Sequence, residues 1–272
     1  MMSSQKILAN VKTRPFFKTD RAVLYNSDYE DILASLPEDS IDVVFADPPY
    51  NLSNGGITVY AGKIASVNKG DWDKSKGFDE DLDFHMRWIE ACRRVLKPNG
   101  TIWITGTYHS VYQCGYALQR HDFHILNDIA WFKPNAAPNI SGRYFAASHE
   151  TILWARKHKK IPHVFNYLDM KGGNWHETDF LKKEDKQMRS VWSINTPKPA
   201  EKRFGKHPTQ KPLDLLVRII SASTEPNDVV LDPFTGSSTT GVAALKLGRR
   251  FIGIDKEKSY LTLSTKRLKA VQ

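Results

Sequence analysis

Apolar residues along the chain alternate between short continuous runs and positions spaced like one face of a helix. Short runs rich in β-branched residues, typical of buried strands, occur at 22–25, 41–46, 101–105, 125–131, 151–155, 229–232 and 251–255. Helical spacing is present around 32–36, 84–96, 111–118, 213–223 and 242–247. Because strands and helices alternate, the pattern predicts an α/β domain on a doubly wound, mostly parallel sheet.

Two stretches have no such periodicity. Residues 1–21 are polar and basic, and we interpret them as a loose N-terminal arm. Residues 52–76 are rich in glycine and polar side chains, which is typical of a lid or binding loop and less often of plain disorder. Around 97–100 the sequence Lys-Pro-Asn-Gly predicts the end of the preceding helix.

The first strong candidate for chemistry follows the strand 41–46, at Asp47-Pro48-Pro49-Tyr50. Two prolines fix φ and remove two backbone donors, so they present a carboxylate and an aromatic ring on a stiff turn. Ligands of open α/β sheets bind at the ends of the strands. Taken alone, the same residues also fit an ordinary turn in which Asp47 only caps the chain.

The second candidate lies near the C-terminus, where a strand ending at Asp232 is followed by a small-residue turn containing Gly236, a helix, and a strand ending at Asp255. Such a turn lets a ligand approach the backbone at a helix N-terminus, and an acid about twenty residues further on can accept from ribose hydroxyls. The dinucleotide fingerprint GxGxxG is absent, and a carboxylate at 232 suits a cation better than a pyrophosphate. Glu257 is the alternative to Asp255 as the acid that accepts from ribose hydroxyls.

Composition narrows the class of protein. The chain has 272 residues, 40% of them hydrophobic, and no apolar run long enough to cross a membrane. Together with an N-terminal segment that lacks an apolar core, this predicts a cytoplasmic protein without a membrane partner. Cys92 and Cys114 lie in no metal-binding pattern, so we expect no metal site and two buried apolar cysteines.

The net charge of +9 favours a polyanionic partner, and its distribution is uneven. Residues 134–207 hold 14 Lys/Arg against 7 Asp/Glu, interleaved with aromatic side chains. This texture predicts a nucleic-acid surface, although a run such as 156–160 also fits a solvated face. The expected DNA-binding residues are Arg143, Arg156, Lys157, Lys159, Lys160, Lys202 and Arg203.

These segments, in this order, resemble a known enzyme family. The sequences at 47–50, 207–212 (His-Pro-Thr-Gln-Lys-Pro) and 232–240, placed around a basic insertion, are similar to the β class of S-adenosylmethionine-dependent DNA amino-methyltransferases. The resemblance extends from about 22 to 268. Through 47–50, 54–56 (Asn-Gly-Gly), 69–73 (Lys-Gly-Asp-Trp-Asp) and 206–212 it looks especially like the adenine methyltransferases of the DpnII accessory and MboII restriction-modification systems. The family commonly has glycine where this chain has Ser238.

The resemblance implies a Rossmann-like methyltransferase fold with permuted motif order. It implies four segments: the arm 1–21, a catalytic half 22–133, a target-recognition insertion 134–206, and a cofactor-binding half 207–272. The implied reaction is methyl transfer from S-adenosylmethionine to N6 of an adenine flipped out of the DNA. Catalysis would fall to Asp47, Pro48, Pro49 and Tyr50; the cofactor would contact Asp28, Asp47, His207, Lys211, Asp232, Phe234, Gly236, Ser237, Thr239 and Asp255.

The roles within this set differ. Asp47 and the Pro48 carbonyl would hold the amine, and Tyr50 would stack on the base. Lys211 is expected near the methionine carboxylate and Asp28 near the adenine of the cofactor. His207 fits either a ligand contact or a structural histidine.

Alternatives remain open at this point. The same fold methylates N4 of cytosine, although Asp47 favours adenine as the family pattern implies, and a DNA-binding protein without catalysis is the rival from another class. The expected partners are double-stranded DNA, or single-stranded DNA as with some relatives, and a cognate restriction endonuclease. Related enzymes are often homodimers.

Overall fold

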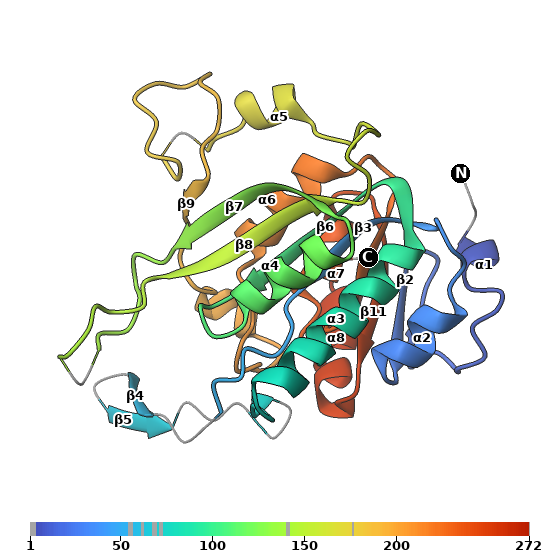
Figure 1. The fold of residues 1–272 in the computed structure, drawn as a ribbon, viewed down its shortest axis with the longest axis horizontal. Helices are drawn as coiled ribbons and strands as arrows, with labels where there is room; N and C mark the ends of the chain where they lie inside the picture. The colour runs from blue at the N-terminus through green and yellow to red at the C-terminus, as the bar shows by residue number, and fades with distance from the viewer. Residues whose placement is uncertain are drawn as a thin grey trace.

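The computed structural model describes residues 4–53, 57–60, 63–66, 70, 73–139, 142–175 and 177–271. Its main feature is a nine-stranded sheet with the order β1-β2-β11-β10-β3-β6-β8-β7-β9 (Figure 1). The strands are β1 (Phe17–Lys18), β2 (Ala22–Asn26), β3 (Ile41–Ala46), β6 (Leu96–Gly106), β7 (His124–Phe132), β8 (His149–Arg156), β9 (Val191–Ser193), β10 (Val229–Asp232) and β11 (Arg250–Asp255).

Most neighbouring strands run parallel, as the alternating pattern predicts. The pairs β2–β11, β11–β10, β10–β3, β3–β6 and β7–β9 are parallel. Two strands depart from this arrangement: β8 is antiparallel to both of its neighbours, and β1 is antiparallel to β2. The sheet is therefore mixed and mostly parallel.

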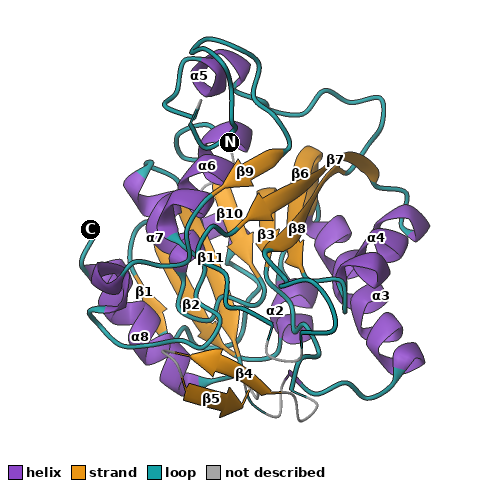
Figure 2. Ribbon diagram, turned by 90° about the vertical axis from the view of Figure 1, so that its left-hand side faces the viewer, coloured by secondary structure: helices purple, strands orange, loops and turns teal. Residues whose placement is uncertain are grey.

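Helices cover both faces of the sheet (Figure 2). One core contains residues of α2, α3 and α4, and the other contains residues of α6, α7 and α8. Along β3, Val44 and Ala46 face the first core while Val43 and Phe45 face the second, which explains why its apolar run is continuous. The helices are α1 (Ser4–Ile7), α2 (Tyr29–Ser35), α3 (Phe78–Val95), α4 (Val111–Arg120), α5 (Tyr167–Lys171), α6 (Leu213–Ser223), α7 (Thr239–Lys246) and α8 (Lys258–Lys269), with a 3₁₀ helix at Pro199–Lys202.

The predicted helix at 84–96 begins earlier and ends differently. It starts at Phe78, because three acids in its first turn complement the helix dipole although they add nothing to the apolar spacing. At its other end the chain passes directly into β6 at Leu96. The register of β6 against β3 shifts between Ile41 and Val43, and this irregularity accommodates the Lys-Pro-Asn-Gly segment within the strand.

The stretch 52–76, expected to be an irregular loop, contains a small antiparallel sheet of β4 (Ile57–Tyr60) and β5 (Lys63–Ser66). Strands of four residues are too short to produce a periodic signal in the sequence. The family-like residues 54–56, 69, 71 and 72 lie outside the described residues.

The basic region 134–206 is built into the main sheet at two places. It contributes β8, which lies between β6 and β7, and β9 at the sheet edge. Its later part is fixed to α6 by a buried ion pair in which Arg218 donates to both carboxylate oxygens of Asp179, at 2.5 and 2.7 Å. Trp175 and Trp192 flank the guanidinium at 4.8 and 4.0 Å.

The structure also bears on two expectations from composition. No helix among the described residues is long and apolar enough to span a bilayer. Cys92 and Cys114 are free and buried, as expected, and burial raises the pKa of both thiols.

Candidate active site

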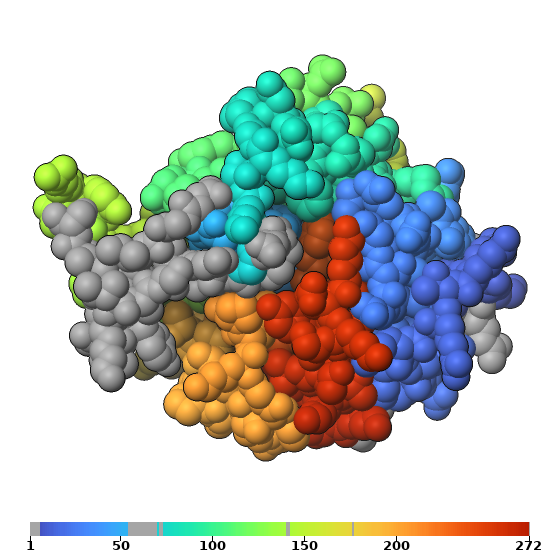
Figure 3. Space-filling model, turned by 90° about the horizontal axis from the view of Figure 1, so that it is seen from below, coloured from blue at the N-terminus to red at the C-terminus, as the bar shows by residue number. Residues whose placement is uncertain are grey.

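Four carboxylates stand at the carboxyl ends of neighbouring parallel strands. Asp28 follows β2, Asp255 ends β11, Asp232 ends β10, and Asp47 follows β3. These strands are consecutive in the sheet, so the four side chains follow one edge of it. The direct pairing of β3 with β10 confirms the expectation that the strands ending at Asp47 and Asp232 are neighbours. Figure 3 shows this edge from below, where blue and red segments from the two ends of the chain lie side by side.

Asp47 is held by three donors. Its Oδ1 accepts hydrogen bonds from the hydroxyls of Tyr50 and Thr105, both at 2.6 Å, and its Oδ2 accepts one from Lys211 Nζ at 2.6 Å. A carboxylate offers about four acceptor positions, so one position on Oδ2 remains. Pro48 and Pro49 have no N–H group that could fill it. Asp47 can therefore accept one further N–H group.

A second carboxylate, that of Glu150, contacts the Tyr50 hydroxyl. The Tyr50 hydroxyl is 3.0 Å from Glu150 Oε2, and Lys211 Nζ is 3.8 Å from the same oxygen. Lys133 forms an ion pair with Glu150 Oε1. We call these four residues, together with Asp47, the carboxylate–lysine cluster. Two positive and two negative charges balance within it.

Electrostatics keeps Lys211 and Glu150 ionised although both are buried. Burial alone would lower the pKa of Lys211, but Asp47 and Glu150 raise it above its ordinary value. Burial alone would raise the pKa of Glu150, but Lys211 and Lys133 hold it below its ordinary value. The pKa of Tyr50 is raised well above its ordinary value by burial and by both carboxylates, so its hydroxyl keeps the proton that it donates.

Asp73 fixes the chain that follows Tyr50. Its Oδ1 accepts from the backbone N–H groups of Tyr50 and Asn51, at 2.8 and 3.0 Å. Its Oδ2 accepts from the N–H of Leu52 and the hydroxyl of Ser53, at 3.2 and 2.9 Å. One buried carboxylate thus satisfies four donors and sets the direction in which the chain leaves the Pro-Pro turn.

A small hollow lies in front of these groups, lined by Asp47, Pro48, Tyr50, Leu52, Asp73 and Thr209. Its volume is about 20 Å³, which is room for about one water molecule. A ligand larger than a water molecule therefore does not fit the hollow in this conformation.

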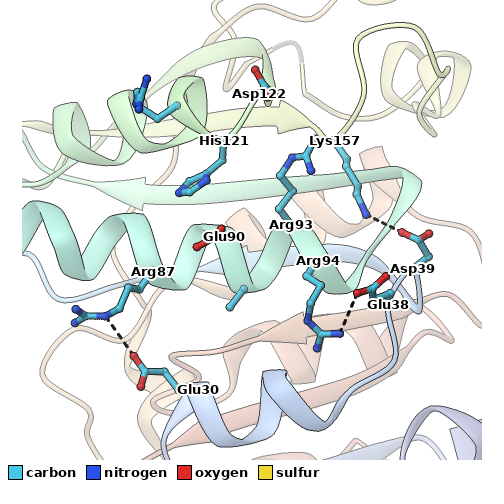
Figure 4. A pocket seen from close by; sticks show the side chains of 12 residues that line it. Glu30, Glu38, Asp39, Arg87, Glu90, Arg93, Arg94, His121, Asp122 and Lys157 are labelled. Carbon is cyan, nitrogen blue, oxygen red and sulfur yellow. Dashed lines mark hydrogen bonds and ion pairs between the residues drawn. The ribbon is translucent and has the colours of Figure 1, made fainter.

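A larger cavity, about 760 Å³, lies elsewhere, beside α3 and near the start of β3 (Figure 4). Its lining carries five acidic and five basic side chains, and three oppositely charged pairs among them are in contact: Arg87 with Glu30, Arg94 with Glu38, and Lys157 with Asp39 (Figure 4). Equal numbers of acidic and basic side chains give no preference for a ligand of either sign, so the carboxyl edge is the better candidate site.

Asp232 is a buried carboxyl group whose pKa is affected by the neighbouring Asp47. Its side chain accepts from Phe234 N–H at 3.1 Å and from the Thr240 hydroxyl at 2.7 Å, and it is only 2% exposed. Among the described residues it forms no ion pair with a lysine or arginine within 4 Å. Burial raises its pKa to about 7, with a contribution from Asp47. A buried carboxylate without a paired cation is suited to a cationic ligand.

Phe234 and Gly236 form the turn after β10. The ring of Phe234 packs edge-on against Tyr29 and Trp88, so α2 and α3 hold it at the sheet edge. Gly236 has a φ of +48°, and a Cβ there would lie 2.9 Å from the His207 ring. Both the backbone angle and the lack of space require glycine.

Asp255 binds two backbone N–H groups. Its oxygens accept from Gly236 N and Glu257 N, both at 2.8 Å, and burial raises its pKa to about 6. Asp255 therefore ties the end of β11 to the small-residue turn. The side chain of its rival, Glu257, is exposed at the start of α8.

Arg267 of α8 stabilises the turn after β10 through hydrogen bonds. Its buried guanidinium donates to the carbonyl and hydroxyl of Ser237, at 2.6 and 2.8 Å, and to the hydroxyl of Thr239 at 2.9 Å. The side chains of Ser237 and Thr239, predicted to contact the cofactor, are thus engaged within the protein.

His207 and Ser238 have structural partners. Burial, together with Lys211 and Arg267, lowers the pKa of His207 to about 3, and its neutral ring packs against Gly236 and Tyr260. Ser238 adopts a left-handed conformation with φ of +53° and ψ of +41°, which explains the glycine common in similar sequences. Its hydroxyl bonds to that of Thr235 at 2.9 Å.

Two other predicted cofactor contacts have partners of their own. Lys211 bonds to Asp47, as described, instead of standing free for a carboxylate of the cofactor. Asp28 caps α2 by accepting from Glu30 N–H at 3.1 Å, and it forms an ion pair with Lys256. Asp28 keeps its place beside Asp255 because β2 and β11 are paired through Asn26 and Asp255.

The predicted DNA-binding residues fall on two different edges of the sheet. Arg156 pairs with Thr101, which is level with Val43 near the start of β3, so the run 156–160 lies at the edge opposite Asp47. Lys157 is also buried, and its ammonium binds Asp39 and the carbonyl of Leu96, at 2.7 and 2.6 Å. Lys157 is therefore a structural residue, and its assignment to a DNA surface is corrected.

The remaining candidates lie near the carboxyl edge. Arg143 is exposed on the loop that joins β7 to β8, which projects from that edge (Figures 1 and 3). The neighbouring rings of Tyr144 and Phe145 are 69% and 97% exposed. Lys202 and Arg203 come shortly before His207, and the Arg203 guanidinium lies 4.7 Å from the Phe204 ring.

Sequence reasoning missed several residues of this site. Glu150, Lys133 and Thr105 come from other strands, and no local spacing connects them to Asp47. Asp73 belongs to the segment 69–73 that carries part of the family resemblance, so a signal existed without a role attached to it. Arg267 is an ordinary basic residue in the last turn of a helix.

Known DNA methylases are similar to this chain in sequence and in fold. The model of a family described as DNA methylase matches residues 41–266. The chain is similar to the type II methyltransferase M2.LlaDCHI of Lactococcus lactis subsp. cremoris, with 52% identity over 94% of this chain and 92% of that protein. It is equally similar to the type II methyltransferase M2.DpnII of Streptococcus pneumoniae, with 52% identity over 95% and 93%. The crystal structure of the M1.HpyAVI–SAM complex resembles it with a TM-score of 0.65 and 31% identity, over 91% of this chain and 98% of that chain.

Proposed function

The chain belongs to the family of DNA methylases, and from this premise we propose that it transfers a methyl group from S-adenosylmethionine to the N6 amine of an adenine in DNA. The observation that carries the proposal is the pair of buried carboxylates at the ends of β3 and β10. Asp47 has one acceptor position left for an amine, and Asp232 lacks a cation. An amine acceptor next to a cation site is what methyl transfer from a sulfonium requires.

The residues at the edge fit the cofactor. S-adenosylmethionine, when bound, supplies an electrophilic methyl group on a cationic sulfur that leaves as a neutral thioether. Asp232, buried without a counter-ion, would hold the cationic part, and the turn at Phe234 and Gly236 would lie along it. Asp255 would face the ribose, where its remaining acceptor positions can take hydroxyl groups.

The residues after β3 fit the substrate. The exocyclic amine of adenine is a poor nucleophile because its lone pair is delocalised into the ring. Asp47 and the Pro48 carbonyl would accept from the amine and favour its pyramidal form, so that the nitrogen can form the bond to the methyl carbon as the carbon–sulfur bond breaks. The methylated nitrogen is acidic and releases its proton to Asp47. Tyr50, which is 6% exposed and has Lys211 Nζ 5.0 Å from its ring centre, would stack on the base when the base enters the site.

The DNA partner would bind across the carboxyl edge. We place Arg143, Lys202 and Arg203 in this surface, with Tyr144 and Phe145 available to stack on bases. A functional pairing with a restriction endonuclease belongs to the same proposal, because both similar proteins are named type II methyltransferases. Homodimer formation is part of it only by analogy with related enzymes.

Analysis of the methylated product tests the adenine assignment. Single- and double-stranded DNA would be incubated with the protein and S-adenosylmethionine, digested to nucleosides and separated by mass. We expect N6-methyldeoxyadenosine, and sequencing of the same DNA would identify the recognised site. N4-methyldeoxycytidine as the product would contradict the choice of base, and no methylated nucleoside from either DNA would contradict the enzyme assignment.

Substitution of Asp47 tests the site itself. Asp47→Asn keeps the shape and one acceptor oxygen but removes the charge that balances Lys211 and the amine. We expect the rate of methyl transfer to fall by at least about 10²-fold, in the range for loss of a proton-accepting group, while S-adenosylmethionine affinity stays within about tenfold. Single-turnover kinetics and calorimetry measure the two quantities. Unchanged turnover in this variant would remove Asp47 from the site.

A further inference from the structure

Glu150 reaches the site from an unexpected direction. It is the second residue of β8, the strand that runs antiparallel between β6 and β7, and it pairs with Trp131. Thr151, next to it, is level with Gly106 at the carboxyl end of β6, so the side chain emerges at the same edge as Asp47. Glu150 is 8% exposed and bears a full charge in this buried position. Burial of a charged carboxylate is costly unless the group is paired with a cation and hydrogen-bonded.

Glu150 and Asp47 share the same two donors. The Tyr50 hydroxyl lies 2.6 Å from Asp47 Oδ1 and 3.0 Å from Glu150 Oε2, yet it has one proton to donate. The Lys211 ammonium lies 2.6 Å from Asp47 Oδ2 and 3.8 Å from Glu150 Oε2. Each donor can therefore turn from one carboxylate to the other with a small movement.

This sharing matters when an amine arrives. With both donors on Asp47, a single acceptor position remains for the substrate. If the Tyr50 hydroxyl donates to Glu150 instead, Asp47 Oδ1 gains a free position, and its negative charge is less neutralised. Lys133, paired with the other oxygen of Glu150, keeps that carboxylate ionised and fixed.

We propose that Glu150 is a positioning residue for methyl transfer, which accepts the hydrogen bond of the Tyr50 hydroxyl and shares the Lys211 charge while Asp47 holds the substrate amine. The inference rests on the proposed function. Glu150 itself touches neither the base nor the cofactor in this proposal. It acts through the orientation of Tyr50 and Lys211.

The first variant is Glu150→Gln, which keeps the size and a carbonyl acceptor but removes the charge. We expect kcat for DNA methylation to fall about 10- to 100-fold, as for other groups that orient catalytic residues. The KM for DNA and the affinity for S-adenosylmethionine should change less than threefold. Glu80→Gln, at an exposed acid in the first turn of α3, is the matched control and should leave kcat unchanged.

A double variant separates positioning from folding. Glu150→Gln leaves Lys133 buried without its partner, which could itself destabilise the protein. In Lys133→Met/Glu150→Gln both charges of that pair are removed, so stability should return towards the wild type. We expect kcat to stay low in the double variant although thermal unfolding and cofactor affinity are close to normal.

A third comparison tests the route through Tyr50. In a Tyr50→Phe background the shared hydroxyl is missing, so Glu150→Gln should lower kcat by less than about threefold, compared with at least tenfold in the wild-type background. A strictly structural Glu150 would give equal effects in both backgrounds.

Four results would overturn the proposal: wild-type kcat in Glu150→Gln, recovery of kcat in the double variant, an equal effect of Glu150→Gln in the wild-type and Tyr50→Phe backgrounds, or loss of folding in both variants, which would make Glu150 a purely structural residue. These results differ from failure of the proposed function, because in that case the wild-type protein would form no N6-methyladenine at all.

Discussion

The raised pKa of Asp232 should make the stability of the folded protein depend on pH. Burial raises its pKa from 3.8 to about 7 in the folded protein. Below about pH 4 the side chain is protonated in both the folded and the unfolded protein. Between pH 4 and 7 the folded protein retains a proton that the unfolded protein has lost. The folded protein without cofactor therefore loses stability over this range, by up to about 4 kcal/mol.

The variant Asp232→Asn removes this titration while keeping an acceptor for Phe234 N–H. We expect it to be more stable than the wild type at pH 8 and nearly equal at pH 4, as measured by thermal unfolding without cofactor. Asp255, whose pKa is raised to about 6, acts in the same direction in both proteins. S-adenosylmethionine should stabilise the wild type and not the variant. A difference between the two proteins that does not depend on pH would contradict the buried-charge interpretation.

Ser238 balances backbone strain against a hydrogen bond. A left-handed conformation costs a residue with a side chain about 1 kcal/mol relative to glycine, whereas its bond to the Thr235 hydroxyl contributes a similar amount. We expect Ser238→Gly to stay within about 1 kcal/mol of the wild type in urea unfolding. Ser238→Ala keeps the strain and loses the bond, so it should be less stable than Ser238→Gly. Equal stability of the alanine and glycine variants would show that strain is not stored at this position.

At the scale of single residues, the sequence identified the carboxylates at the strand ends but not their partners. Asp47, Asp232 and Asp255 each end an apolar run, and a strand end is visible in the sequence. Thr105 reaches Asp47 because β6 is paired with β3, and Glu150 shares two donors with Asp47 because β8 follows β6 in the folded sheet. No local pattern encodes that order. Partners supplied by strand order could not be predicted from one sequence.

At the scale of elements, a buried ion pair joins α6 to the later part of the basic region. Arg218 of α6 and Asp179 are both almost fully buried, and the two carboxylate oxygens also lie near Arg189 N–H and Thr178. Asp179→Ala would leave the guanidinium between two tryptophan rings without a counter-ion. We expect a loss of about 3–5 kcal/mol in urea unfolding. Asp169→Ala, at an exposed acid on α5, is the control, and a loss below about 0.5 kcal/mol for Asp179→Ala would show that the pair does not fasten this region.

Elements with a full turn of apolar spacing or a β-branched run were predicted closely, as at α6 and β10. The start of α3 was missed because its first turn is acidic and exposed, so helix dipole effects rather than packing define it. The direction of β8 could not be predicted either. Its apolar run fits parallel and antiparallel pairing equally well. The direction of β8 is set only by its pairing with β6 and β7.

At the scale of the whole molecule, the direction of β8 determines which charges can meet DNA at the site. Because β8 runs antiparallel to β6, its first residue lies at the carboxyl edge and its last at the opposite edge. The loop before β8, with Arg143 and Phe145, therefore lies on the side of Asp47, whereas Lys159 and Lys160 lie on the other side. Charge density along the sequence favoured 156–160, and the topology favours the loop.

This difference can be measured with two matched double variants. Arg143→Ala/Phe145→Ala removes one exposed charge and one exposed ring from the carboxyl edge, and we expect KM for DNA to rise about tenfold, since one base-stacking contact is worth about 1–3 kcal/mol. The slope of log affinity against log salt should fall by about one. Lys159→Ala/Lys160→Ala removes two exposed charges from the opposite edge and should change KM less than twofold. If the second variant weakened DNA binding more than the first, DNA would have to bind at the opposite edge of the sheet. Asp47, at the carboxyl edge, would then not face the bound DNA.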